Sequence, residues 1–205
     1  MAYQHDIFIS YKRDYIGDRW LIEQFLPHFR KFVANDISAF CPDRAPLPIF
    51  FDQTNLPGSA HHMGLEGIEP GEEWKPRLST ALEHSRCLVA LCTPLYFRSP
   101  WCAIEWETFA QRARSTDKTL IVPVSIHDGD SFPEHARRLQ FVNLARYWID
   151  RLDHDHNLYS PFQQEVRSLA ERVARVVASA PQFAEWRAAR SADVAGEPLI
   201  GKPLL

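Results

Sequence analysis

Short apolar runs alternate along the chain with longer stretches whose apolar positions recur at helical spacing. The apolar runs predict strands over residues 6–10, 48–51, 87–92, 120–124 and 141–144. The amphipathic stretches predict helices over residues 18–33, 72–84, 101–114 and 160–178, with a short helix inside the loop 128–138. Strands and helices that alternate in this way are typical of βαβ units around a parallel sheet.

Some positions refine these elements. Residues 87–92 form a nearly continuous apolar run, which is typical of a central parallel strand covered on both faces. Pro123 cannot donate to a strand ladder, so we expect it at a sheet edge or a strand end. Asp18 is a candidate N-cap, and Pro27 predicts a kink inside the helix that follows.

The predicted fold is therefore α/β, a flavodoxin-like doubly wound sheet of about five parallel strands with helices on both faces. In such sheets ligands bind beyond the carboxyl ends of the strands, so chemistry is expected just after Ser10, Phe51, Cys92 and Val124. After Pro181 the periodic pattern fades. We expect one domain over residues 1–180 and a C-terminal tail or linker over 181–205.

Composition and charge argue against some classes of partner and location. The formal net charge of −3 is spread along the 205 residues, without the Lys/Arg clusters of a nucleic-acid-binding surface. No apolar run approaches the roughly 18 residues of a membrane span, and the first residues lack the pattern of a secretory signal. The four cysteines form no CxxC pair, which favours a reducing, cytoplasmic location. We therefore expect neither nucleic acid nor a membrane among the partners.

Polar residues follow the first two predicted strands. Lys12 and Arg13, after Tyr11, suit a phosphate group, although they also suit a solvated turn. Asp52 could accept a hydrogen bond from a ribose hydroxyl or could cap the loop that follows.

That loop, residues 52–71, is long for a compact domain, and such loops tend to be functional. It contains His61 and His62, but adjacent histidines seldom share one metal ion in a preformed site. We expect no metal site.

The segment after the third predicted strand is the most informative. Ser99 is a candidate N-cap and Pro100 suits the first helical position. Trp101 and Glu105 are four residues apart and share one helix face. An indole beside a carboxylate suits a cationic or oxocarbenium-like species. The alternative is a solvated Glu105 on an amphipathic helix with Trp101 in the core.

Other chemistry finds no support in the sequence. Glu107 lies about 200° round the helix from Glu105, so we do not expect it in the same site. There is no G-x-S-x-G motif, no P-loop and no Cys/His nucleophile pairing. The first strand is followed by Tyr-Lys-Arg rather than G-x-G-x-x-G, which argues against a dinucleotide-binding dehydrogenase.

These segments, in this order, resemble a TIR (Toll/interleukin-1 receptor) domain of the bacterial NAD-cleaving type over residues 5–178. The similar segments are Asp6-Ile7-Phe8-Ile9-Ser10-Tyr11, Ile49-Phe50-Phe51-Asp52 with Pro70-Gly71-Glu72-Glu73-Trp74, Ser85 to Leu91, and Tyr96 to Glu105. The last contains the Trp-Cys pair that precedes the family's catalytic glutamate. The BB loop departs from the family, because it is longer by about a dozen residues, from Gln53 to Leu65.

The resemblance implies an NAD+ nucleosidase that releases nicotinamide and yields ADP-ribose or a cyclic isomer, with Glu105 as the catalytic residue. NAD is then the substrate, and no cofactor is implied. The implied NAD-binding residues are Tyr11, Lys12, Arg13, Phe51, Asp52, Trp74, Ser99 and Trp101. Lys12 and Arg13 would lie near the phosphates, and Trp101, Trp74 and Phe51 would flank the rings. The resemblance also implies self-association, which can be filamentous, and a role in antiphage defence by signalling or NAD depletion.

Two alternatives remain open at this stage. A non-enzymatic TIR adaptor would act through TIR–TIR contacts, and such members usually lack the glutamate. A nucleoside deoxyribosyltransferase-like enzyme would share the sheet architecture and a glutamate, although Lys12 and Arg13 favour a phosphorylated substrate.

Overall fold

The computed structural model describes residues 2–13, 19–52, 65–68, 71–149, 152 and 154–190. Its centre is a six-stranded, all-parallel sheet with strand order β3-β2-β1-β4-β5-β6. The strands are β1 (His5–Tyr11), β2 (Ile49–Phe50), β3 (Leu65–Glu66), β4 (Ser85–Cys92), β5 (Ile121–Ser125) and β6 (Val142–Asn143). Among the described helices, none is both long and apolar enough to cross a membrane.

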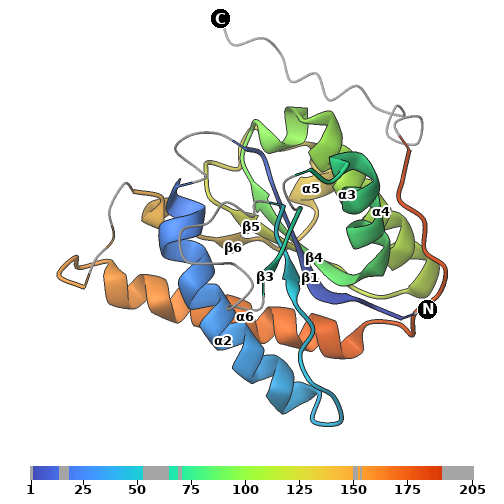
Figure 1. Ribbon diagram of the computed structural model, residues 1–205. Coiled ribbons are helices and arrows are strands. Elements are labelled where there is room, and N and C mark those ends of the chain that lie inside the picture. The colour runs from blue at the N-terminus through green and yellow to red at the C-terminus, as the bar shows by residue number, and fades with distance from the viewer. Residues whose placement is uncertain are drawn as a thin grey trace, which may run out of the picture.

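Helices cover both faces of the sheet (Figure 1). The first layer contains α2 (Leu26–Phe40) and α6 (Tyr159–Ser179), and the second contains α3 (Trp74–His84), α4 (Pro100–Thr116) and α5 (Glu134–Arg137). Short helical turns are η1 (Leu21–Phe25), η3 (Tyr96–Arg98) and η4 (Ala145–Tyr147). The predicted doubly wound α/β class is thus confirmed.

Alternation along the strands explains the two layers. Ile7 and Ile9 of β1 pack in the core under α2 and α6, whereas Phe8 packs under α3 and α4. Val89 and Ala90 of β4 divide between the two cores in the same way. A strand buried on both faces is apolar at most positions, as the run 87–92 indicated.

The sheet has one strand more than the roughly five expected. β3 lies within residues 52–71, which the sequence presented only as a loop, and it pairs in parallel with β2. Without β3, the order β2-β1-β4-β5-β6 is that of flavodoxin-like folds. Unlike β2 and β6, which have the same length, the two residues of β3 are not part of an apolar run, so only the pairing with β2 defines this strand.

The first predicted helix differs near Pro27 and at its C-terminal end. The candidate cap Asp18 lies outside the described residues. A π-helical turn, η1, comes just before Pro27, and the backbone N–H of Leu26 donates to Leu21 O. This wider turn takes the place of the expected kink, because a proline ring would clash with the carbonyl four residues earlier in a regular α-helix. The helix then continues to Phe40 rather than ending near Val33.

Pro123 was expected at a sheet edge or a strand end, but it lies inside β5, between β4 and β6. Its position in the register is opposite Ala90 of β4. Leu144 N donates to Ser125 O, so odd-numbered residues of β5 direct their backbone polar groups toward β6. Because β6 begins only at Val142, opposite Val124, the nitrogen of Pro123 has no strand beside it to pair with. The position is a local edge within an interior strand.

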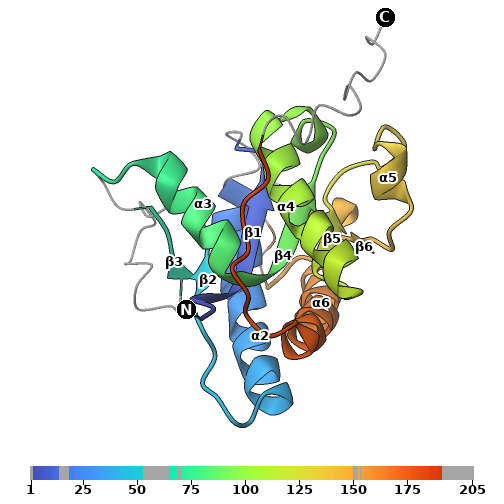
Figure 2. The same ribbon diagram turned by 90° about the vertical axis from the view of Figure 1, so that its right-hand side faces the viewer.

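Residues 180–190 pack back on the domain beside α3 and α4, where Figure 2 shows this segment in red. Ala189 N donates to Thr108 Oγ1 of α4 at 2.9 Å. The indole of Trp186 lies over the Arg112 guanidinium, 5.0 Å from ring centroid to Cζ. Arg112 is buried and donates to the carbonyls of Ser85 and Leu82, so it joins α4 to the end of α3. Trp186 therefore covers the charged group that fastens these two helices.

We predict that Trp186→Ala destabilises the domain by about 2 kcal/mol, because it removes a cation–π contact and exposes a buried guanidinium. For a chain of this size this corresponds to a fall in Tm of roughly 4–8 °C. Differential scanning calorimetry would measure it, with the exposed neighbour Glu185→Ala as the control. Equal Tm values for the two variants would contradict the assigned role of Trp186.

Candidate active site

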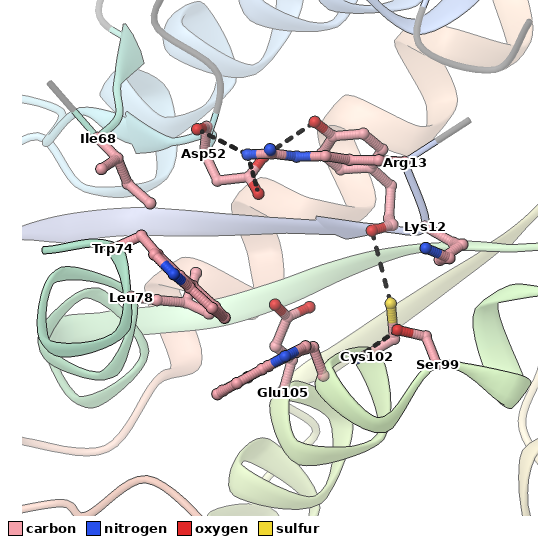
Figure 3. Close-up of a pocket in the computed structure, with 11 residues that line it drawn as sticks. Lys12, Arg13, Asp52, Ile68, Trp74, Leu78, Ser99, Cys102 and Glu105 are labelled. Carbon is pink, nitrogen blue, oxygen red and sulfur yellow. Dashed lines mark hydrogen bonds and ion pairs between the residues drawn. The ribbon is translucent and has the colours of Figure 1, made fainter. Parts of the chain in front are cut away.

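A cavity of about 590 Å³ lies at the carboxyl ends of β1 and β2 and at the start of α4 (Figure 3). The chain runs from β1 outward to β2 and β3, and then returns to β4 on the other side of β1. The strand order thus reverses between β1 and β4. Such a switch point leaves a crevice beyond the strand ends, which is where ligands bind in open α/β sheets.

The structure brings together eight of the nine residues predicted for the site. The cavity is lined by Tyr11, Lys12, Arg13, Asp52, Trp74, Ser99, Trp101 and Glu105, and additionally by Ile68, Leu78 and Cys102. The exception is Phe51, whose side chain is 1% exposed in the core under α2 and α6. Its ring stacks on Tyr11 with centroids 5.2 Å apart, so it supports a wall residue and does not line the cavity.

Local sequence explains how α4 presents Glu105. Ser99 is the N-cap, and its hydroxyl accepts a hydrogen bond from Cys102 N at 3.4 Å. Pro100 occupies the first turn, where its missing N–H costs little. Glu105 then lies one turn after Trp101, and Figure 3 shows its carboxyl group pointing from α4 into the cavity. It is 7% exposed, so the solvated alternative is not what the structure shows.

Two buried hydroxyl groups lie behind this carboxyl group. Ser10 Oγ, from β1, donates to Glu105 Oε2 and lies 2.8 Å from the Tyr96 hydroxyl of η3. Ser10 and Tyr96 are each 1% exposed. The carboxyl group is therefore held from behind by the Ser10 hydroxyl, which Tyr96 contacts in turn, while it faces the cavity.

Burial raises the pKa of Glu105 to about 8, because desolvation disfavours the carboxylate anion. The hydrogen bond from Ser10 opposes this rise, the negative charge of Asp52 adds to it, and the positive charge of Arg13 lowers it. Perturbed carboxyl groups of this kind, in a cleft, are typical of functional sites.

A second polar group forms the opposite wall. Arg13 Nη2 pairs with Asp52 Oδ2 at 2.8 Å, and the Tyr11 hydroxyl donates to Asp52 Oδ1 at 2.9 Å. Much of the Arg13 charge is therefore compensated within the protein. Lys12 also lines the cavity and makes no ion pair with any residue in the described ranges.

The mouth of the cavity is aromatic. Trp74 and Trp101 make an edge-to-face pair with centroids 4.7 Å apart and planes at 72°. They are 45% and 37% exposed, so Trp101 is not the core residue of the alternative interpretation. Lys75 Nζ lies 5.5 and 5.8 Å from the two rings. Exposed indoles at a cavity mouth suit stacking on a flat, polar ring.

Glu107, although only two residues from Glu105, belongs to a different face of α4. Its side chain is 25% exposed and pairs with Arg114 at 2.6 Å, in line with the helical spacing. Within the described part of the chain, no group of His, Cys, Asp and Glu could hold a metal ion. His61 and His62 lie outside the described residues.

Sequence reasoning did not identify Ile68, Leu78 or Cys102 as lining residues. A signal existed for two of them, because Leu78 lies one turn after Trp74, and Cys102 lies one turn before Glu105. Ile68 follows β3 inside the aperiodic loop segment and gives no such signal.

We predict that Glu105→Gln changes how stability depends on pH. A carboxyl group whose pKa is raised from 4.5 to about 8 contributes stability below pH 4.5 that is lost as pH rises to 8. The neutral isostere avoids this loss. The free energy of unfolding of the variant should therefore rise relative to that of the wild type between pH 5 and 8, by on the order of a few kcal/mol. Above pH 8 the difference should stay constant.

Urea unfolding at pH 5, 7 and 9 measures this difference. Glu107→Gln is the matched control, because an exposed ion pair contributes about 1 kcal/mol or less. Parallel pH profiles for wild type and Glu105→Gln would show that the carboxyl group is not desolvated.

Comparisons with known proteins show which family this chain resembles. Residues 58–158 match the profile of the TIR domain family, a span that runs from before β3 to the residue before α6 and includes Trp74, Trp101 and Glu105. No curated protein matches the chain significantly. The TIR domains in the structure of the activated Roq1 resistosome directly recognizing the pathogen effector XopQ are similar at 17% identity, with a TM-score of 0.35, over 83% of this chain and 84% of that one. The chain therefore carries a domain of the TIR family.

Proposed function

We propose that this TIR domain is an NAD glycohydrolase or cyclase that cleaves the bond between nicotinamide and ribose, with Glu105 as its catalytic residue. The observation that carries the proposal is a buried carboxyl group that lines the switch-point cavity one turn from an exposed indole. Carboxylates that oppose positive charge on a sugar are the common device of glycosidic bond cleavage.

A single carboxylate is sufficient for this reaction. Nicotinamide leaves NAD from a cationic pyridinium, takes the bonding electron pair and departs neutral, so no general acid is needed. The glycosidic carbon becomes positively charged, and Glu105 stabilises it while holding the ribose hydroxyls. Addition of water gives ADP-ribose and releases one proton. Attack by an internal adenine or ribose nucleophile gives a cyclic isomer instead.

The raised pKa of Glu105 fits this role. Without a ligand, burial favours the protonated acid. A pyridinium held within a few ångströms would favour the anion, because an opposite charge nearby lowers a carboxyl pKa. Substrate would then ionise the group it needs, and the desolvated anion interacts strongly with the charge that develops at the sugar.

The other lining residues suggest how NAD is oriented. Lys12 suits the pyrophosphate, because it makes no ion pair among the described residues, whereas Arg13 already pairs with Asp52. The Trp74–Trp101 pair suits a nucleobase or nicotinamide ring. By the resemblance of the sequence, activity would require assembly of several copies, and the biological role would be antiphage defence by NAD depletion or a nucleotide signal.

We predict that Glu105→Ala lowers nicotinamide release by about 10²-fold or more, the usual effect of losing a group that stabilises transition-state charge. The assay follows nicotinamide by chromatography from a concentrated sample with NAD, and also separates linear from cyclic ADP-ribose. Glu107→Ala, on the outer face of the same helix, should retain activity.

Equal release from wild type and Glu105→Ala would remove the proposed role of this carboxyl group. Partner binding that survives Glu105→Ala, with no NAD turnover in any assembled state, would instead support an adaptor. Turnover of deoxynucleosides but not NAD would support the deoxyribosyltransferase-like alternative.

We also predict that Trp101→Ala raises KM for NAD by about 10-fold with a smaller effect on kcat, since base–aromatic stacking contributes about 1–3 kcal/mol. Trp101→Phe should keep most of the affinity. Steady-state kinetics of both variants test this, and an unchanged KM for Trp101→Ala would mean that the indole does not contact substrate.

A further inference from the structure

The hydrogen-bond chain behind Glu105 has a direction that depends on where the proton lies. When Glu105 is ionised, Tyr96 donates to Ser10 Oγ and Ser10 donates to Glu105 Oε2, so every hydroxyl proton has an acceptor. If Glu105 were protonated on Oε2, it would donate to Ser10, and Ser10 would donate to Tyr96. The Tyr96 proton would then have no acceptor among the described residues, although its side chain is 1% exposed. An unmet buried donor is costly, so this chain disfavours a proton on Oε2. The hydrogen bond from Ser10 also lowers the pKa of Glu105, against the effect of burial.

The same contacts distinguish the two carboxylate oxygens. Oε2 is occupied by Ser10, whereas Oε1 forms no hydrogen bond with any residue in the described parts of the chain. Since Glu105 lines the cavity, Oε1 is the oxygen available to a ligand. A carboxylate with one oxygen fixed cannot rotate freely, so the position of the second oxygen is set in advance.

We propose that Ser10, oriented by Tyr96, is a positioning residue for Glu105 that fixes Oε2 and thereby presents Oε1 to the glycosidic carbon and ribose hydroxyls. The second half of this statement rests on the proposed function, whereas the restraint on the carboxyl group does not.

Other groups around Glu105 cannot supply this restraint. Asp52 is negative and raises the pKa of Glu105, and Arg13 is held by Asp52 at 2.8 Å. Cys102, one turn earlier on α4, donates its thiol to Tyr11 O at 3.5 Å and remains uncharged, because burial raises its pKa to about 12. Lys12 lines the cavity but makes no hydrogen bond or ion pair with the carboxyl group. Among the described residues, Ser10 is the hydrogen-bond donor that contacts the Glu105 carboxyl group.

The first test measures the restraint without catalysis. Unfolding free energies are measured from pH 4 to 11 for the wild type and for each variant, with and without Glu105→Gln. The effect of Glu105→Gln gives the contribution of the carboxyl group. This contribution falls with rising pH until the pH reaches the pKa of Glu105 in the folded state. In the wild type it should level off near pH 8. In Ser10→Ala it should level off about one to two pH units higher, since hydrogen bonds to charged groups are strong.

Two further variants make the result specific. Tyr96→Phe should shift the plateau in the same direction by a smaller amount, because it removes only the donor to Ser10. Ser85→Ala is the matched control: it removes another fully buried strand hydroxyl, whose partner is Ala81 O, and should leave the plateau unchanged. A plateau at the same pH in wild type, Ser10→Ala and Tyr96→Phe overturns the proposal.

The second test is the pH profile of nicotinamide release. Ser10→Ala should shift its alkaline-rising limb by the same one to two pH units, and so lower the rate at pH 7 by about 10- to 100-fold. A shifted stability plateau without nicotinamide release from any chain supports the restraint and rejects the proposed function. Release by the wild type with an unshifted profile in Ser10→Ala rejects the positioning role and leaves the proposed function standing.

Discussion

The structure of the site depends on the desolvation of one carboxyl group. Glu105 projects from α4 toward the end of β1, at the point where the strand order reverses, and it is nearly inaccessible to water. A carboxyl group in such a place must be protonated or be compensated by hydrogen bonds and charge. The arrangement around it supplies two hydroxyl groups behind it, and among the described residues no cation pairs with it on the cavity side. A cationic ligand can take that position.

The wall opposite Glu105 follows a different principle. There the charges of Arg13 and Asp52 compensate each other, and Tyr11 fixes the second oxygen of Asp52. Phe51 stacks on Tyr11 from the core, so apolar packing under α2 and α6 sets the position of the Tyr11 ring. The cavity thus combines a rigid, nearly neutral wall, one poorly solvated acid and an aromatic mouth, which is the usual mixture of apolar lining and a few placed polar groups.

The sequence predicted what depends on local pattern. The apolar runs located the five strands other than β3, and Ser99 with Pro100 located the start of α4. Helical spacing then placed Trp101 and Glu105 together. Features that depend on distant partners were not predictable: β3 exists only through its pairing with β2, and the Ser10–Tyr96 contact joins residues 86 positions apart. The alternation of strand faces also explains Phe51, which adjoins the site in sequence but points into the core.

The pairing of β3 with β2 holds the residues on either side of 53–64, Phe51 and Leu65, against the sheet. Phe51 N donates to Glu66 O at 2.8 Å, and the Glu66 side chain is bound by Arg77 and lies 3.1 Å from His5 Nε2. Closing a loop between fixed ends becomes only slowly more expensive with length, by about 0.6 kcal/mol per doubling. Changes in the length or sequence of residues 53–64 should therefore cost little free energy of folding. Because Phe51 and Glu66 are held in place on either side, such changes should also leave the position of Asp52 and the neighbouring site unaltered.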